Sequence, residues 1–216
     1  MKLKNKKVDW EFYIQAIIVI VLAGILIYSY SGKVGSKSVG SEIRTVPASS
    51  IIPTGVPKVY GEELGITYDD VSPTDPKKAD STIRLLGNID RVETLSEPEL
   101  ERYINILYYM ENGIACEYCC GARSVIFSNG QPACGCAHSY AMRGLTKYLI
   151  KYHPEMSDEE ILTEVGKWKV LFFPGILENK AQVMENYGIN VDYINLTTNK
   201  YRGIEQGVKG GMVGAC

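Results

Sequence analysis

Hydrophobic and polar positions form two kinds of pattern along the chain, a long uncharged run near its start and helical stripes after residue 96. The run over residues 12–30, FYIQAIIVIVLAGILIYSY, contains no charged side chain. About 20 apolar residues suffice to cross a bilayer as a helix, and aromatic residues at both ends of the run are typical of membrane interfaces. No A-x-A-like cleavage site follows it, so the pattern predicts a retained transmembrane anchor rather than a cleaved signal.

Basic residues on the two sides of this run predict its orientation. Residues 1–11 contain four lysines, whereas Lys33, Lys37 and Arg44 follow the run. Because positively charged flanks stay on the cytoplasmic side, we expect residues 1–11 to be a cytoplasmic tail. Residues 12–30 would then be a single-pass anchor in membrane lipid, with the C-terminal part outside the cytoplasm. Such a compartment permits disulfides.

Four further segments are defined by composition and periodicity. Residues 31–57 are rich in glycine, serine and proline, which predicts a flexible linker. Residues 58–95 show no clear period and are expected to be an irregular lead-in. Residues 96–205 carry the helical stripes and predict a folded domain. Residues 206–216 are glycine-rich and predict a mobile tail.

The domain over residues 96–205 is expected to contain about four helices. Capping boxes predict the starts of two of them, one from Ser96 and Glu99 and one from Ser157 and Glu160. A third is predicted to start near Ala137, and a fourth spans the segment ILENKAQVMENYG, whose glycine ends it. The segment VDYINLT is expected to be extended. The predicted fold class is therefore mainly α, a single N-terminal transmembrane helix plus a small cysteine-rich helical domain.

Charge and motif content exclude several classes of function. The formal net charge is −2, and a nucleic-acid partner would require a clear basic excess. No Ser/His/Asp set, phosphate-binding loop or pair of catalytic carboxylates rises above background, which leaves no enzyme class favoured. The sequence therefore predicts a binding domain rather than an enzyme.

The candidate chemistry lies in one short window, CEYCCGARSVIFSNGQPACGCAH, which contains five of the six cysteines. Two thiol-rich turns separated by a loop are typical of zinc and iron–sulfur sites, since each turn supplies two thiolates. A tetrahedral zinc ion would need four donors, and soft thiolates also suit Cu(I), which accepts two or three sulfurs. The candidate metal ligands are Cys116, Cys119, Cys120, Cys134, Cys136 and His138, with Cys116, Cys119, Cys134 and Cys136 as the first choice for zinc.

Two other readings of the same thiols stay open. Outside the cytoplasm, the five cysteines could form two disulfides between the turns and staple a small interaction domain without metal. They could also carry out thiol–disulfide exchange, with Cys116 or Cys134 attacking and a neighbour resolving. Cys216, the last residue, is a further candidate ligand or resolving thiol on a glycine-rich arm.

The order of these elements resembles the bacterial PCYCGC-motif proteins, a family of small cysteine-rich lipoproteins at the cell surface. The segments that carry the resemblance are ELERYINILYYMENG, CEYCCG, CGCAHSYAMRGL and MSDEEILTEV, over roughly residues 97–169. CEYCCG departs from the family signature, and Ile25 stands where a lipidated cysteine would be. The resemblance implies a cell-surface helical module that binds a heavy metal, and it implies no reaction.

Together these features predict a membrane-tethered, extracytoplasmic domain that binds zinc or copper through clustered cysteines. The ion would be structural, or it would be carried to or from a metal-donor or metal-acceptor protein. The alternatives are a membrane-anchored thiol–disulfide oxidoreductase and a disulfide-stapled interaction domain.

Overall fold

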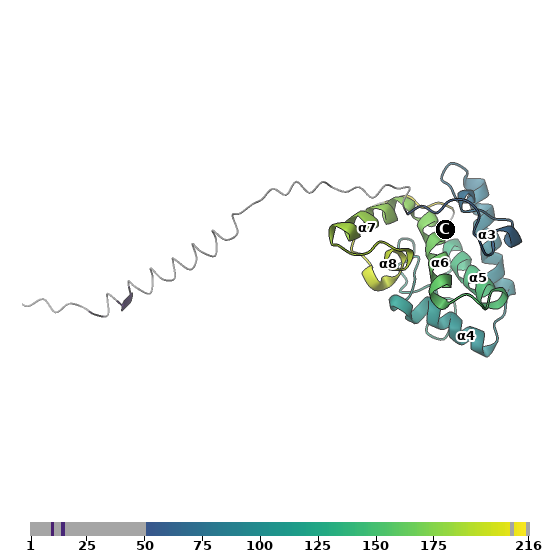
Figure 1. The fold of residues 1–216 in the computed structure, drawn as a ribbon, viewed down its shortest axis with the longest axis horizontal. Helices are drawn as coiled ribbons and strands as arrows, with labels where there is room; N and C mark the ends of the chain where they lie inside the picture. Colours follow the sequence, from purple (N-terminus) through teal and green to yellow (C-terminus); the bar gives the residue numbers. More distant parts are fainter. Residues whose placement is uncertain (1–9, 11–13, 16–50, 208–209, 215–216) are drawn as a thin grey trace, which may run out of the picture. The chain divides into compact units, whose positions relative to one another are not determined.

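The computed structural model describes residues 10, 14–15, 51–207 and 210–214 of the 216-residue chain. The chain divides into two units, Met1–Ile43 and Arg44–Cys216. The described part of the second unit is helical and has no strand, only two isolated β-bridges (Figure 1). Its α-helices are α2 (Gly61–Leu64), α3 (Pro76–Val92), α4 (Glu97–Ile104), α5 (Ala137–Tyr152), α6 (Asp158–Phe172), α7 (Pro174–Asn186) and α8 (Tyr193–Thr197). The mainly α fold class is confirmed.

The structure does not test the predicted membrane anchor. No helix there is long and apolar enough to cross a bilayer. The predicted anchor over residues 12–30 and the tail over residues 1–11 lie almost wholly outside the described residues, so both stay predictions. The predicted linker ends earlier than expected, because Ile51 and Pro53 are already buried against the domain.

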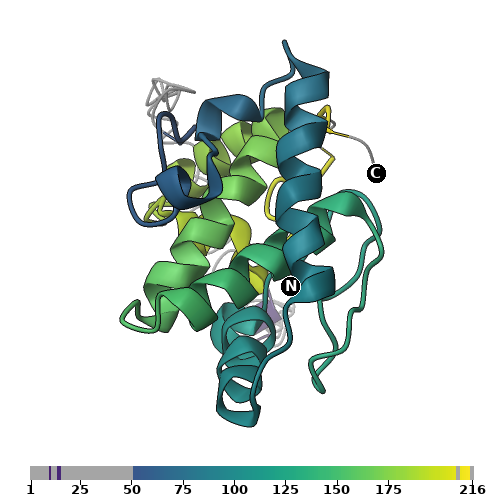
Figure 2. The ribbon, with the colours of Figure 1, turned by 90° about the vertical axis from the view of Figure 1, so that its right-hand side faces the viewer.

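Helix α3 is the main correction to the expected fold, since residues 58–95 were predicted to be irregular. Asp75 caps the helix by accepting a hydrogen bond from the Lys78 amide, and Pro76 occupies the first turn. The helix makes the most extensive helix–helix contact of the domain, with α5. Figure 2 shows α3, in blue, lying across α5 in green. The lead-in is therefore part of the core.

Close packing of α3 on α5 depends on a glycine. A Cβ atom at Gly144 of α5 would lie 1.9 Å from the Leu86 carbonyl oxygen of α3. Since no side chain fits there, the two helices approach backbone to backbone at this point. The buried face of α3 also contains small and polar residues, Ala79, Gly87 and Asp90 among them. Ala79, Ile83 and Leu86 nevertheless recur at helical spacing, a pattern that the expectation of an irregular segment overlooked.

The remaining helices start and end as local signals predict. Both capping boxes form, at Ser96 with Glu99 for α4 and at Ser157 with Glu160 for α6. Helix α7 ends at Asn186, and Gly188 follows with φ +69°. The largest fully buried side chain is that of Trp168 in α6, which donates its indole N–H to the Tyr60 hydroxyl over 2.7 Å. Tyr60, which lies in the predicted lead-in, therefore provides the hydrogen-bond acceptor for the buried Trp168 indole.

Two predicted segments differ from the structure near the C-terminus. VDYINLT was expected to be extended and instead forms α8, because the Asp192 side chain accepts a hydrogen bond from the Asn195 amide and caps a helix there. The tail over residues 206–216 was expected to be mobile. Within it Val213 is buried, and its amide donates to the Phe172 carbonyl oxygen over 2.9 Å.

Candidate metal centre

The first cysteine turn, Cys116–Cys120, begins where the chain leaves a distorted helical stretch. Helix α4 continues into a π turn, Asn105–Tyr109, and a 3-10 turn, Met110–Asn112. Gly113 then adopts φ +88°, and a Cβ there would lie 2.9 Å from the Tyr108 carbonyl oxygen. The helical stretch ends at this glycine, and Cys116 follows in the core, where it is 1 % exposed.

A buried ion pair holds this first turn in an unusual conformation. Glu117 adopts φ +56°, a left-handed backbone that costs a non-glycine residue about 1–2 kcal/mol. Its carboxylate lies 3.2 Å from the Lys169 ammonium of α6, which is fully buried and also donates to the Thr197 carbonyl oxygen over 2.7 Å. Tyr118 donates to the Glu205 carboxylate over 2.8 Å. The turn is therefore fixed to α6 and to the segment after α8.

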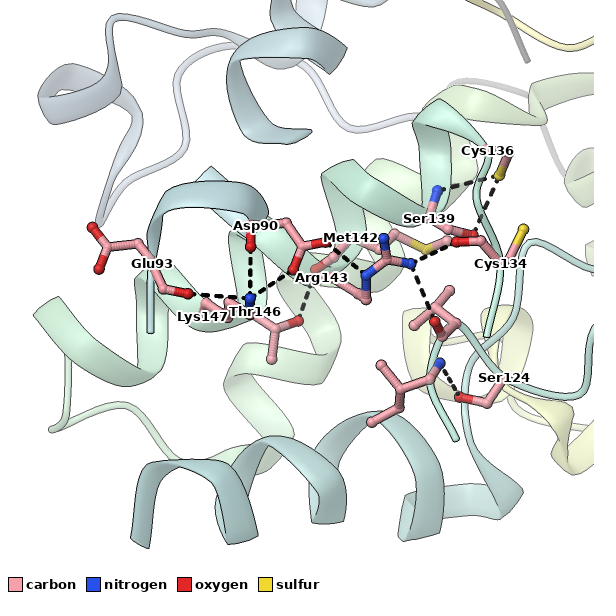
Figure 3. Close-up of polar contacts among 12 residues, drawn as sticks. Asp90, Glu93, Ser124, Cys134, Cys136, Ser139, Met142, Arg143, Thr146 and Lys147 are labelled. Atoms are coloured by element: carbon pink, nitrogen blue, oxygen red, sulfur yellow. Dashed lines mark hydrogen bonds and ion pairs between the residues drawn. The ribbon is translucent and has the colours of Figure 1, made fainter. Parts of the chain in front are cut away.

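A second buried cation holds the other cysteine turn. Arg143 of α5 is fully buried and donates to the Cys134 carbonyl oxygen over 2.8 Å and to the Val125 carbonyl oxygen over 3.2 Å. Its Nε pairs with Asp90 of α3 over 2.8 Å, and Lys147 pairs with the same carboxylate over 2.8 Å. Figure 3 shows Arg143 between Asp90 and the backbone of Cys134. The α3–α5 contact thus positions the second turn.

Cys136 is the N-cap of α5, which starts at Ala137 as the sequence predicts. Its sulfur accepts a hydrogen bond from the Ser139 amide over 3.4 Å, and Ser139 Oγ lies 3.3 Å from it. A thiolate there is favoured by the unpaired N–H groups of the first turn. The hydrogen bond from Cys116 and the contacts of His138 and Ser139 lower the pKa of Cys136, despite its partial burial.

The neighbouring thiols have the opposite tendency. The hydrogen bond to Cys136, and then burial, raise the pKa of Cys116. Burial and the contact with Cys120 raise the pKa of Cys134 to about 11. The Cys136 sulfur is therefore favoured as a thiolate, whereas Cys116 and Cys134 are favoured as protonated thiols.

The two cysteine turns converge, with all five described cysteines close together and no disulfide between them. Cys116 Sγ lies 3.1 Å from Cys136 Sγ, and Cys120 Sγ lies 2.7 Å from Cys134 Sγ. Cys119 belongs with both pairs. The sulfurs of Cys116, Cys119 and Cys136 lie within 4.8 Å of one another, and so do those of Cys119, Cys120 and Cys134. Each of these two triads could hold a metal ion.

The grouping differs from the first choice of zinc ligands. Cys116, Cys119 and Cys136 lie together, whereas Cys134 groups with Cys119 and Cys120. Within the described part of the chain, each convergent group contains three ligands. A metal–sulfur distance of about 2.3 Å places the sulfurs of a trigonal site about 4.0 Å apart and those of a tetrahedral site about 3.8 Å apart. Both values lie inside the 4.8 Å limit of the triads.

The sixth candidate ligand, His138, lies beside the cluster and in neither triad. It is fully buried, its Nε2 lies 2.8 Å from the Val213 carbonyl oxygen, and its ring packs on Phe172 and Phe173. No hydrogen bond to its Nδ1 is present among the described residues. Cys216 lies outside the described residues.

Sequence reasoning missed the residues that support the cysteines, namely Glu117, Arg143 and Lys169. A signal for two of them exists, because Arg143 and Lys169 are charged residues inside strongly apolar helical segments, YAMRGL and KWKVLFF. Charged side chains are almost never fully buried unless they are paired. Such positions therefore indicate a buried partner, although they do not identify it.

Comparison with family models, with curated proteins and with solved structures gave no match. The resemblance to the PCYCGC-motif proteins therefore stays a prediction.

Proposed function

We propose that this protein binds a thiophilic metal ion through its clustered cysteines, with Cu(I) favoured over zinc. The observation that carries the proposal is the position of Cys119, whose sulfur groups with both close sulfur pairs. Two disulfides between the turns would use only four of the five sulfurs. They would give no reason for the Cys119 sulfur to lie close to both pairs. A metal site requires a third ligand at that position.

The number of ligands favours Cu(I). Structural zinc is almost always bound by four ligands in a tetrahedron, whereas Cu(I) is satisfied by two or three soft sulfurs. Each triad supplies three sulfurs at compatible distances. The close pairs must open on binding, by about 0.9 Å for Cys116–Cys136 and about 1.3 Å for Cys120–Cys134, to reach the trigonal spacing.

The surroundings of the site support a carried ion rather than a structural one. Both turns are fixed by contacts that involve no metal, Lys169 with Glu117 and Arg143 with the Cys134 carbonyl. Cys120 is exposed, which gives a partner's ligand direct access to the cluster. A structural zinc site, in contrast, is unfolded without its metal. Chelation is therefore expected to leave the far-UV circular dichroism spectrum of this protein unchanged.

The predicted anchor over residues 12–30 completes the proposal. It would hold the metal-binding domain on the outer side of the cytoplasmic membrane, where a metal-donor or metal-acceptor protein would exchange the ion. The exchange would proceed by ligand replacement, with one thiolate of the partner entering as one thiolate of the triad leaves.

The test is an anaerobic titration of the reduced full chain, in mild detergent, with Cu(I) against a chromophoric Cu(I) chelator and separately with Zn(II). The chain is expected to take Cu(I) from the chelator, and the Cys136→Ser variant is expected to lose at least about tenfold in affinity. The control is Ser128→Ala, which changes an exposed loop and keeps all the cysteines. Failure of the unmodified chain to compete for Cu(I), or preferential retention of Zn(II), would refute the preference for copper.

The close sulfur pairs favour thiol–disulfide exchange as a second candidate function. The sulfurs of Cys116 and Cys136 are 3.1 Å apart, and an S–S bond of about 2.05 Å would require them to approach by about 1.0 Å. In such a cycle the Cys136 thiolate attacks a substrate disulfide and displaces one substrate thiolate. Cys116, as it loses its proton, then attacks Cys136 and releases the second, so the substrate is reduced and a Cys116–Cys136 disulfide forms.

Thiol counting separates the two candidates. The chain is purified without reductant, unfolded in the presence of a chelator and reacted with a chromogenic thiol reagent. Six reactive thiols are expected for the metal-binding protein. A count of two would indicate two disulfides and would favour the second candidate.

A further inference from the structure

Cys119 occupies a position that a single three-sulfur site does not explain. It belongs to an inner triad with Cys116 and Cys136 and to an outer triad with Cys120 and Cys134. Two separate trigonal ions would need six sulfurs. The described cluster contains five, and the one that both triads share is Cys119. Five sulfurs are enough for two three-coordinate ions if one thiolate binds both ions.

We propose that the cluster binds two Cu(I) ions, with the Cys119 sulfur as a bridge between an inner and an outer three-sulfur site. This inference rests on the proposed metal-binding function and extends it. The inner ion would be held by Cys116, Cys119 and Cys136, and the outer ion by Cys119, Cys120 and Cys134. Each sulfur that carries a proton releases it to solvent as it binds copper, and six copper–sulfur bonds form, with no change in oxidation state.

The two sites differ in exposure, which assigns them different roles. In the inner triad Cys116 is buried, while Cys119 and Cys136 are partly buried. In the outer triad Cys120 is exposed. A partner's thiolate can therefore reach the outer ion without opening the core. The inner ion would be retained while the outer ion is exchanged.

Buried cations close to the two cysteine turns can offset part of the charge of the cluster. Two Cu(I) ions and five thiolates sum to −3. Lys169 is fully buried and pairs with Glu117 of the first turn, and the buried Lys180 ammonium, which the Glu117 carboxylate also attracts, has no hydrogen-bond partner among the described residues. Arg143 is fully buried beneath the second turn. Positive groups in a low-dielectric interior stabilise nearby anions more strongly than surface groups do.

The experiment counts bound ions in the full chain, in two cysteine variants and in one control variant. Reduced, detergent-solubilised protein is titrated anaerobically with Cu(I) against a chromophoric chelator, and the copper X-ray absorption spectrum is recorded at saturation. The unmodified chain is expected to bind two Cu(I) ions per chain and to show copper–copper scattering. Ser128→Ala, on an exposed loop, is the control and is expected to behave in the same way.

Cys119→Ser and Cys120→Ser separate a bridge from two independent sites. Loss of the bridge is expected to weaken both binding steps by about tenfold or more and to remove the copper–copper scattering. Cys120→Ser is expected to weaken only one step. Circular dichroism checks that each variant is folded. If a variant does not fold, the copper–copper scattering of the unmodified chain still tests the bridge.

Each other outcome overturns a defined part of the reasoning. A stoichiometry of one, absence of copper–copper scattering, or a Cys119→Ser variant weakened at a single step would overturn the bridged pair and leave the proposed function standing. No competition for Cu(I) by the unmodified chain would overturn the proposed function as well.

Discussion

Replacing Arg143 by methionine tests whether the α3–α5 contact positions the cysteine cluster. Methionine retains much of the buried volume but removes all the donors of the guanidinium group. Asp90 would lose one of its two cationic partners and keep Lys147. The Val125 carbonyl would keep its bond from the Ala133 amide, whereas the Cys134 carbonyl would lose the 2.8 Å bond from Arg143.

The magnitude follows from these losses. A hydrogen bond to a charged group contributes about 1.5–3 kcal/mol, and a buried carbonyl left unsatisfied costs about 1–3 kcal/mol. Together they predict a destabilisation of about 3–5 kcal/mol, in line with the cost of breaking a buried ion pair. For a domain of this size that corresponds to a fall in Tm of roughly 6–20 °C. Because Cys134 would lose its support, the Cu(I) affinity is expected to fall by about 10–100-fold.

The assay is thermal and chemical unfolding of the full chain in detergent, with chelator and reductant present, followed by Cu(I) competition at a temperature where the variant is folded. Arg84→Met is the matched control, since Arg84 is an exposed arginine of α3 and its loss is expected to change stability by less than about 0.5 kcal/mol. If Arg143→Met matched Arg84→Met in both stability and Cu(I) affinity, the argument that Arg143 positions the cluster would be refuted.

Three further substitutions test the fold around the site, each by chemical unfolding of the metal-free chain. Gly144→Ala would place a Cβ 1.9 Å from a carbonyl oxygen of α3, so a loss of about 1–3 kcal/mol is expected, and unchanged stability would contradict the close approach of the helices. Burial raises the pKa of Asp70, but its bonds with Lys78 and Thr67 outweigh this and lower it overall. Its contribution is therefore present above about pH 4 and lost as the pH falls through the lowered value. Asp70→Asn is expected to cost about 1–3 kcal/mol at pH 7 and to flatten the stability profile below pH 4, and a parallel profile would contradict this. Ser157→Ala removes the N-cap of α6 and is expected to cost about 1 kcal/mol, whereas Ser128→Ala, on an exposed loop, should cost nothing measurable.

Features that depend on neighbouring residues in the chain could be predicted from the sequence. The helix starts at Ser96 and Ser157 and the stop at Gly113 are set by hydrogen bonds and backbone angles within a few residues. Convergence of the two cysteine turns is nearly local as well, because only 13 residues separate Cys120 from Cys134. Closing a loop of this length costs little conformational entropy, so the two turns can meet readily.

Features that depend on distant partners could not be predicted. The buried face of α3 includes Gly87 and Asp90, which have a place in the core only because α5 presents Tyr140 and Arg143 to them. The division of the cysteines into two triads depends on the directions of adjacent side chains. No spacing rule distinguishes which sulfur of the pair Cys119 and Cys120 lies between the two turns.

The contacts that fix the two cysteine turns involve the backbone and charged side chains rather than the sulfurs. Glu117 keeps a strained backbone conformation in the first turn, which persists only where surrounding contacts enforce it. The contact here is a buried ion pair with Lys169, and in the second turn it is the bond from Arg143 to Cys134. Neither contact involves a cysteine side chain, so the sulfurs can change partners while the turns stay in place. A site that must gain and lose an ion without unfolding requires this separation between the groups that fix the backbone and the groups that bind the ion.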